Sequence, residues 1–155
     1  VMLILFGIFF ILIERYNRKK KPVMTSLNSL TYQAAVIIGL FQLIAAVFPG
    51  TSRSGATILG ALLIGVSRTV AAEYTFFLAI PVMFGASALK LFKFGFDFTG
   101  QEFAILAVGM ISAFVVSVLA IKFLMGYIKK HDFKAFGYYR IVLGVLVLLY
   151  FLIFG

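Results

Sequence analysis

The sequence predicts an all-α integral membrane protein, a polytopic helical bundle that contains a re-entrant helical hairpin. Of its 155 residues 63% are hydrophobic and 12% are charged, and the mean hydropathy is +1.13. These values exclude a soluble globular domain and a disordered chain. The apolar runs have the lengths of helices, and the short alternating segments typical of a membrane β-barrel are absent from the sequence.

The first apolar run, residues 1–14, is short for a membrane span. Up to Ile13 it gives about 20 Å of helix, against a hydrocarbon core about 30 Å thick. We interpret it as a truncated transmembrane helix and expect the chain to be the C-terminal part of a longer polypeptide. A signal peptide is the alternative, but no basic stretch precedes the run. Residues 15–27 form a basic loop that we expect on the cytoplasmic side.

Residues 28–66 hold two apolar arms that flank the polar stretch PGTSRSGAT, Pro49 to Thr57. The second arm is about 20 Å long if helical, too short to cross a bilayer alone. Two helical arms joined by a polar apex predict a re-entrant hairpin. Three fuller spans follow at 74–92, 103–125 and 135–154, and Pro81 is expected to bend the first of them.

The distribution of positive charge tests the hairpin, because Lys and Arg collect in cytoplasmic loops. If the hairpin returns to its starting side, only Lys90 and Lys93 lie on the opposite side. Eleven then share the first side: Arg15, Arg18, Lys19, Lys20, Lys21, Arg68, Lys122, Lys129, Lys130, Lys134 and Arg140. A single crossing gives seven against six. The hairpin with cytoplasmic open ends is favoured, although two closely spaced crossings give the same count. Bases placed this way indicate membrane orientation rather than a nucleic-acid partner.

Arg53 is the one cation that the sequence places away from a membrane boundary. An arginine at mid-bilayer costs about 3 kcal/mol on insertion scales, so it needs an anion or a wet cavity. None of the five acids is well placed to serve: Glu14, Glu73, Asp97, Glu102 and Asp132 all lie at span ends or in loops. A guanidinium binds two phosphate oxygens at once, and hydroxyls and a helix N-terminus add donors. The sequence therefore predicts an anion site made of Arg53, Ser52, Ser54, Gly55 and Thr57, with Thr51 and Gln42 behind them.

Two alternatives to this site stay open at this point. The Ser, Thr and Gly residues could simply cap and pack a broken helix, with Arg53 paired to an acid elsewhere in the full protein. Gln42 could bridge the two arms instead of reaching the site. Lys122 and Arg140 are interpreted as side chains that extend to the lipid headgroups, with an interhelical acid as the other option for Arg140.

PGTSRSGAT resembles the second signature of the undecaprenyl-diphosphate phosphatases, the bacitracin-resistance family. The resemblance continues in GLFQLIAAVFPG, FFLAIPVMFGA and YRIVLG, from Leu30 onward. It implies a multi-pass enzyme of the bacterial inner membrane, built from two inverted repeats, with an active site open to the outer face. Such an enzyme hydrolyses undecaprenyl diphosphate to the monophosphate and phosphate, which recycles the carrier for peptidoglycan synthesis. Cell wall biogenesis, cell shape and resistance to the antibiotic bacitracin depend on that recycling.

The resemblance also assigns roles. Arg53 and Ser52 become catalytic residues, and Ser54, Gly55 and Thr57 complete the phosphate site. A divalent cation, Mg or Ca, is expected on the missing N-terminal repeat, since the family's first signature has no counterpart here and His131 fits a solvated loop. The nucleophile could be water, a serine of the missing repeat, or Ser52. The partners are the lipid diphosphate, the membrane and that repeat, with a homo-oligomer left open. A transporter or flippase for a phosphorylated substrate is the alternative function.

Overall fold

The computed structural model describes residues 1–18, 20–95 and 99–154, and these residues form helices and no extended sheet. The predicted all-α fold class is therefore confirmed. Lys19 and Asp97, which entered the charge arguments, lie outside the described residues. The elements are α1 (Met2–Asn17), the short 3-10 helix η1 (Leu27–Ser29), α2 (Tyr32–Val47), α3 (Arg53–Leu63), α4 (Arg68–Phe94), α5 (Gly100–Lys130) and α6 (Lys134–Phe154).

Three helices are long and apolar enough to cross a membrane: Arg68–Phe94, Gly100–Lys130 and Lys134–Ile153. They correspond to the three expected spans, and the first two begin several residues earlier, at polar N-caps. The hydroxyl of Ser67 accepts a hydrogen bond from the N–H of Val70, and Thr99 and Glu102 form a reciprocal capping box. Pro81 lies inside α4, which continues through it. The length and apolar composition of these three helices identify the chain as a membrane protein.

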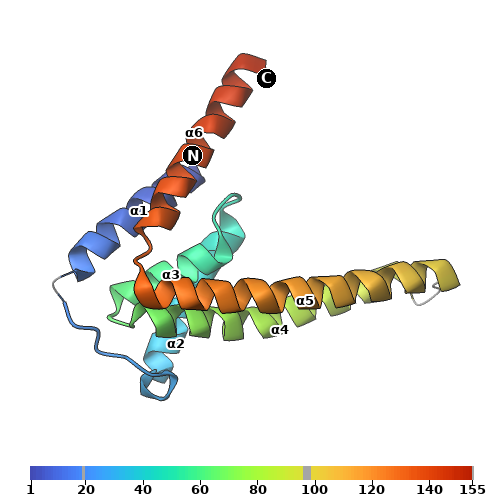
Figure 1. Cartoon of the computed structure of the whole chain (residues 1–155), viewed down its shortest axis with the longest axis horizontal. Coiled ribbons are helices and arrows are strands. Elements are labelled where there is room, and N and C mark those ends of the chain that lie inside the picture. The colour runs from blue at the N-terminus through green and yellow to red at the C-terminus, as the bar shows by residue number, and fades with distance from the viewer. Residues whose placement is uncertain (19, 96–98, 155) are drawn as a thin grey trace.

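The helices are arranged as pairs (Figure 1). α4 and α5 run side by side along the longest axis, while α1 and α6 form a second pair. Glycines allow the close approach of α1 and α6: a Cβ on Gly7 would meet the carbonyl oxygen of Gly137 at 2.8 Å. The remaining two helices, α2 and α3, pack against each other and lie where the other pairs meet.

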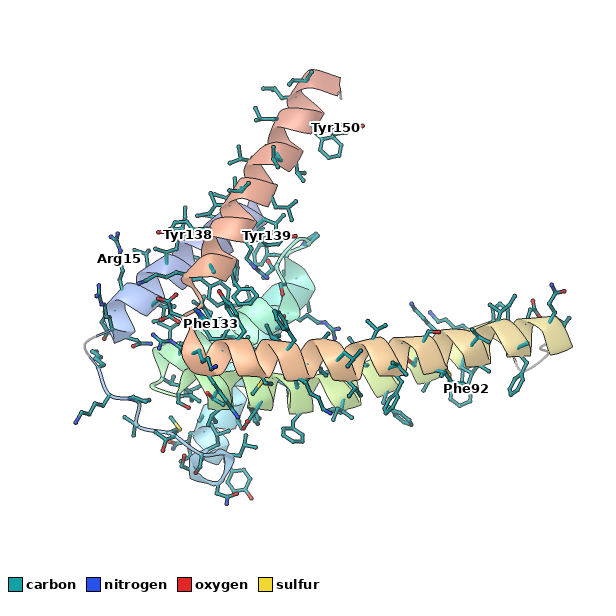
Figure 2. All side chains as sticks on the ribbon, in the orientation of Figure 1. Arg15, Phe92, Phe133, Tyr138, Tyr139 and Tyr150 are labelled. Atoms are coloured by element: carbon teal, nitrogen blue, oxygen red, sulfur yellow. The ribbon has the colours of Figure 1, made fainter. Side chains whose placement is uncertain are left out.

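Two apolar clusters hold this junction together. The first joins α1, α3, α4 and the α5–α6 turn, and Phe133 at that turn is one of its members (Figure 2). The second places Ile38 of α2 against α3 and the start of α4. Most apolar side chains of α5 are exposed although α4 runs beside it, which suits a surface that faces lipid or further protein.

The basic ends of the helices come together around a buried ion pair. Glu14 of α1 is 2% exposed, and its two carboxylate oxygens share the Nε–H of Arg68, whose Nη2 also donates to Oε2. Oε1 of Glu14 also accepts the N–H of Phe133 at 3.0 Å. The amide of Asn17 donates to the carbonyl of Leu62, at the end of α3, at 2.9 Å. The end of α1, the end of α3, the start of α4 and the α5–α6 turn are thus one structural unit.

A cavity of about 550 Å³ opens beside this unit and is lined mainly by bases. Six of the residues that the charge count placed on one side line it: Arg18, Lys20, Arg68, Lys129, Lys130 and Lys134. His131 also lines it; its exposed ring stacks on Tyr127, 4.4 Å between centroids. The helix ends that the positive-inside argument grouped are therefore neighbours in space.

Candidate anion-binding site at the apex of α2 and α3

The PGTSRSGAT stretch forms the turn between α2 and α3 and the first turn of α3. Gly50 has φ +84°, a backbone conformation that a side chain would strain, and the N–H of Thr51 donates to the carbonyl of Phe48 at 3.2 Å. Ser52 is the N-cap of α3, and its Oγ accepts the N–H of Gly55 at 3.2 Å. The apex is a tight turn that ends at a helix N-terminus.

The hydrogen bonds at this helix start leave donors for a ligand. The N–H of Gly55 donates to the side chain of Ser52 and that of Ala56 to the carbonyl of Ser52, so neither is free for a ligand. Among the described residues the N–H groups of Arg53 and Ser54 have no acceptor. Ser52 and Ser54 share one hydrogen bond, 3.0 Å between their Oγ atoms, which leaves one of the two hydroxyl protons available.

Arg53, the first residue of α3, is exposed. Within the described part of the chain, the ion pairs are Arg68 with Glu14 and Lys134 with Asp132, and neither involves Arg53. Two N–H groups, a hydroxyl and a guanidinium therefore lie within one helical turn. No carboxylate of the described residues pairs with this group of hydrogen-bond donors and positive charge, so the apex can bind an anion that carries several oxygens.

Thr57 lies on the buried side of the same helix, 2% exposed. Its hydroxyl is 3.0 Å from that of Thr75 in α4 and 3.1 Å from the carbonyls of Arg53 and Ser54. The geometry gives Thr57 a role in fixing the first turn of α3 against α4. Gln42 is half-buried in α2, and the structure gives it no hydrogen bond to α3 among the described residues. Thr51 is buried with an Oγ atom that lacks a partner there.

Arg140 was missing from the predicted site, and the structure places it at the apex. Its guanidinium lies against Gly55: a Cβ at that position would be 2.9 Å from Nη2. The interpretation of Arg140 as a side chain that extends to the headgroups is wrong, because half-burial against α3 holds it inside the helix junction. The absence of a side chain at Gly55 was a sequence signal for a close neighbour, but nothing in the sequence named that neighbour.

The donor set of the apex does not suit a metal ion. Arginine and serine donors surround it, and in the described residues no three His, Cys, Asp or Glu side chains come together. Two acids line the basic cavity instead: Glu14 pairs with Arg68, and Asp132 pairs with Lys134. The partial burial of Asp132 opposes ionisation, but hydrogen bonds from Lys134 and the charges of Lys134 and Arg68 outweigh it and hold the pKa of Asp132 below its ordinary value.

Comparison with known proteins gives a consistent result over nearly the whole chain. A protein of Clostridium acetobutylicum named undecaprenyl-diphosphatase 1 is 74% identical over 153 residues, 99% of this chain and 56% of that protein. One of Desulfitobacterium hafniense, named undecaprenyl-diphosphatase, is 73% identical over 151 residues, 97% of this chain and 54% of that protein. The chain spans about half the length of the curated relatives it matches. The family model described as bacitracin resistance protein BacA matches residues 1–146, and the chain belongs to that family.

Proposed function

We propose that this chain supplies the phosphate-binding hairpin of a longer undecaprenyl-diphosphatase. The observation that carries the proposal is the identity of 73% and 74% to relatives with that name, over almost every residue present. The apex supports it independently, because its free guanidinium, hydroxyl proton and helix N–H groups match the oxygens of a phosphoryl group.

The hairpin is re-entrant in this proposal, and the dimensions of α3 support that placement. Its 11 residues correspond to about 17 Å of helix, a little over half of a hydrocarbon core about 30 Å thick. Leu63, the last residue of α3, lines a second cavity that shares Arg68 and Lys129 with the basic cavity. If these basic helix ends lie at the cytoplasmic surface, Arg53 at the other end of α3 lies near the middle of the membrane. We assign the chain to the bacterial inner membrane, with the apex open toward the outer face.

In the reaction, a nucleophile attacks the terminal phosphorus and the bond to the bridging oxygen breaks, which gives the lipid monophosphate and phosphate. Arg53 binds the oxygens of the departing phosphoryl group and neutralises the charge on them, and the N–H groups of the helix start assist. Ser52 already accepts the N–H of Gly55, so we assign it to phosphate binding and to the cap rather than to attack. Thr57 positions the turn through Thr75.

The family resemblance implies a divalent cation, which the apex residues do not fit. We assign the ligands of the cation, and the general base, to the part of the enzyme that this chain does not cover. The lipid diphosphate, the membrane and that second repeat are the partners in this proposal.

Phosphate release distinguishes an enzyme from a carrier. The full-length protein that contains this chain, purified in detergent without any gradient, is incubated with undecaprenyl diphosphate and Mg²⁺ or Ca²⁺. Stoichiometric release of inorganic phosphate and formation of the lipid monophosphate are expected. If the protein binds the lipid but releases no phosphate, under conditions in which a known diphosphatase is active, the proposed enzyme activity is refuted and a transporter or flippase is favoured.

A further inference from the structure

Arg140 places part of its guanidinium in a buried environment without a hydrogen-bond partner, which is unusual for an arginine that only supports the fold. Its side chain leaves α6 seven residues into that helix and lies between Gly55 of α3 and the ring of Phe10 in α1, with Cζ 5.6 Å from the ring centroid. Nη1 is buried and has no hydrogen-bond partner among the described residues. A buried cation usually has an anion beside it, because an unpaired charge inside the membrane is costly.

The described part of the chain offers Arg140 no such anion. The ion pairs in the described residues join Glu14 to Arg68 and Asp132 to Lys134, and both lie at the basic helix ends. The contact with Phe10 is a cation–π interaction at the outer limit of distance, and such contacts compensate only part of a buried charge.

Position ties this guanidinium to the apex. Cζ and Nη1 would each be 3.1 Å from a Cβ on Gly55, the residue whose N–H the Ser52 cap holds. Two arginines from distant parts of the chain therefore flank one helix start, Arg53 on its exposed side and Arg140 on its packed side. Thr51, two residues before Arg53, adds a buried hydroxyl with no partner in the described residues.

We propose that Arg140 is a second phosphate-binding residue of the apex, and that the two guanidinium groups together bind the two phosphate groups of a lipid diphosphate. The inference rests on the proposed function, since it names a further residue of that site. A lipid monophosphate needs only one of the two arginines, whereas a diphosphate carries more charge and twice the phosphate groups. Arg140 thus makes the site selective for substrate over product.

The test uses two ligands that the enzyme does not cleave, the methylenediphosphonate analogue of farnesyl diphosphate and farnesyl phosphonate. Their Kd values are measured with full-length protein in detergent, for wild type and Arg140→Gln. Loss of a charge-assisted contact predicts a Kd for the diphosphonate about 10- to 100-fold higher. The Kd for the monophosphonate should change less than about threefold, by the same count of contacts. Arg15→Gln, the same substitution at an exposed arginine that points away from the helices (Figure 2), should leave both values unchanged.

Three results would overturn the inference. The first is a wild-type Kd for the diphosphonate in folded Arg140→Gln. The second is an equal loss for both ligands. The third is a lower unfolding temperature with normal binding, which would show that Arg140 pairs with a carboxylate elsewhere in the enzyme. If Arg140→Gln does not fold, Arg140→Lys keeps the charge and loses the planar fork, and its diphosphonate Kd should still rise; an unchanged value refutes the inference. A wild-type protein that binds neither ligand and releases no phosphate refutes the proposed function instead.

Discussion

Glu14 is the residue whose removal should most damage the helix junction. In Glu14→Ala the buried N–H of Phe133 loses its acceptor, which costs about 1–3 kcal/mol. The Arg68 side chain is 41% exposed, so water replaces much of the lost ion pair, and that loss adds only up to about 1 kcal/mol. The expected destabilisation is therefore about 1–4 kcal/mol. Glu14→Gln keeps an oxygen for Phe133 and should cost about half as much.

The free energy of unfolding is measured on the full-length protein in detergent, by titration with SDS followed by circular dichroism. A double-mutant cycle with Arg68→Gln isolates the pair, and a coupling of about 0.5–1 kcal/mol is expected, because Arg68 is partly exposed to water. Glu73→Gln in α4 is the matched control: Glu73 has no ion pair among the described residues, so its change should stay within about 0.5 kcal/mol. Strictly additive effects of the Glu14 and Arg68 substitutions would refute the pairing.

Two glycine substitutions test the helix contacts in the same assay. A Cβ on Gly60 would lie 2.6 Å from Cγ of Phe41, so Gly60→Ala should destabilise the α2–α3 pair by about 1–3 kcal/mol, whereas Gly39→Ala, with nothing within 4 Å, should be neutral or slightly stabilising; equal effects would contradict the packing. Gly7→Ala should separate α1 from α6 with a similar cost, because its Cβ would meet backbone, while Gly109→Ala in the open face of α5 should not. Wild-type stability of Gly7→Ala would place α1 and α6 apart.

The sequence alone was sufficient for the fold class and the three long spans, because hydropathy and helix length report on the membrane directly. It also placed the apex turn, since Pro49, Gly50 and the Ser52 cap act locally. The grouping of basic helix ends followed from charge alone and agrees with the cavity they line.

Contacts between residues far apart in the chain were beyond sequence reasoning. Glu14 and Arg68 are 54 positions apart, and their pairing depends on how α1 packs against the end of α3. The Arg140 contact with Gly55 depends on the α1–α6 pair in the same way. Thr57 was predicted as a phosphate-binding residue from its place in the first turn of α3, whereas its contact with Thr75 depends on how α4 packs and has no local sequence signal. Local patterns specify a helix and its caps, while the packing angle decides which face meets which neighbour.

The decisive measurement is the rate of phosphate release from undecaprenyl diphosphate by full-length Arg53→Gln, alongside Arg15→Gln and wild type at equal amounts of folded protein. Arg53 should contribute charge stabilisation in the transition state, so its loss should lower kcat by about 100- to 1,000-fold. Arg15→Gln should match wild type. A kcat for Arg53→Gln within twofold of wild type would contradict the assignment of the apex as the phosphate site.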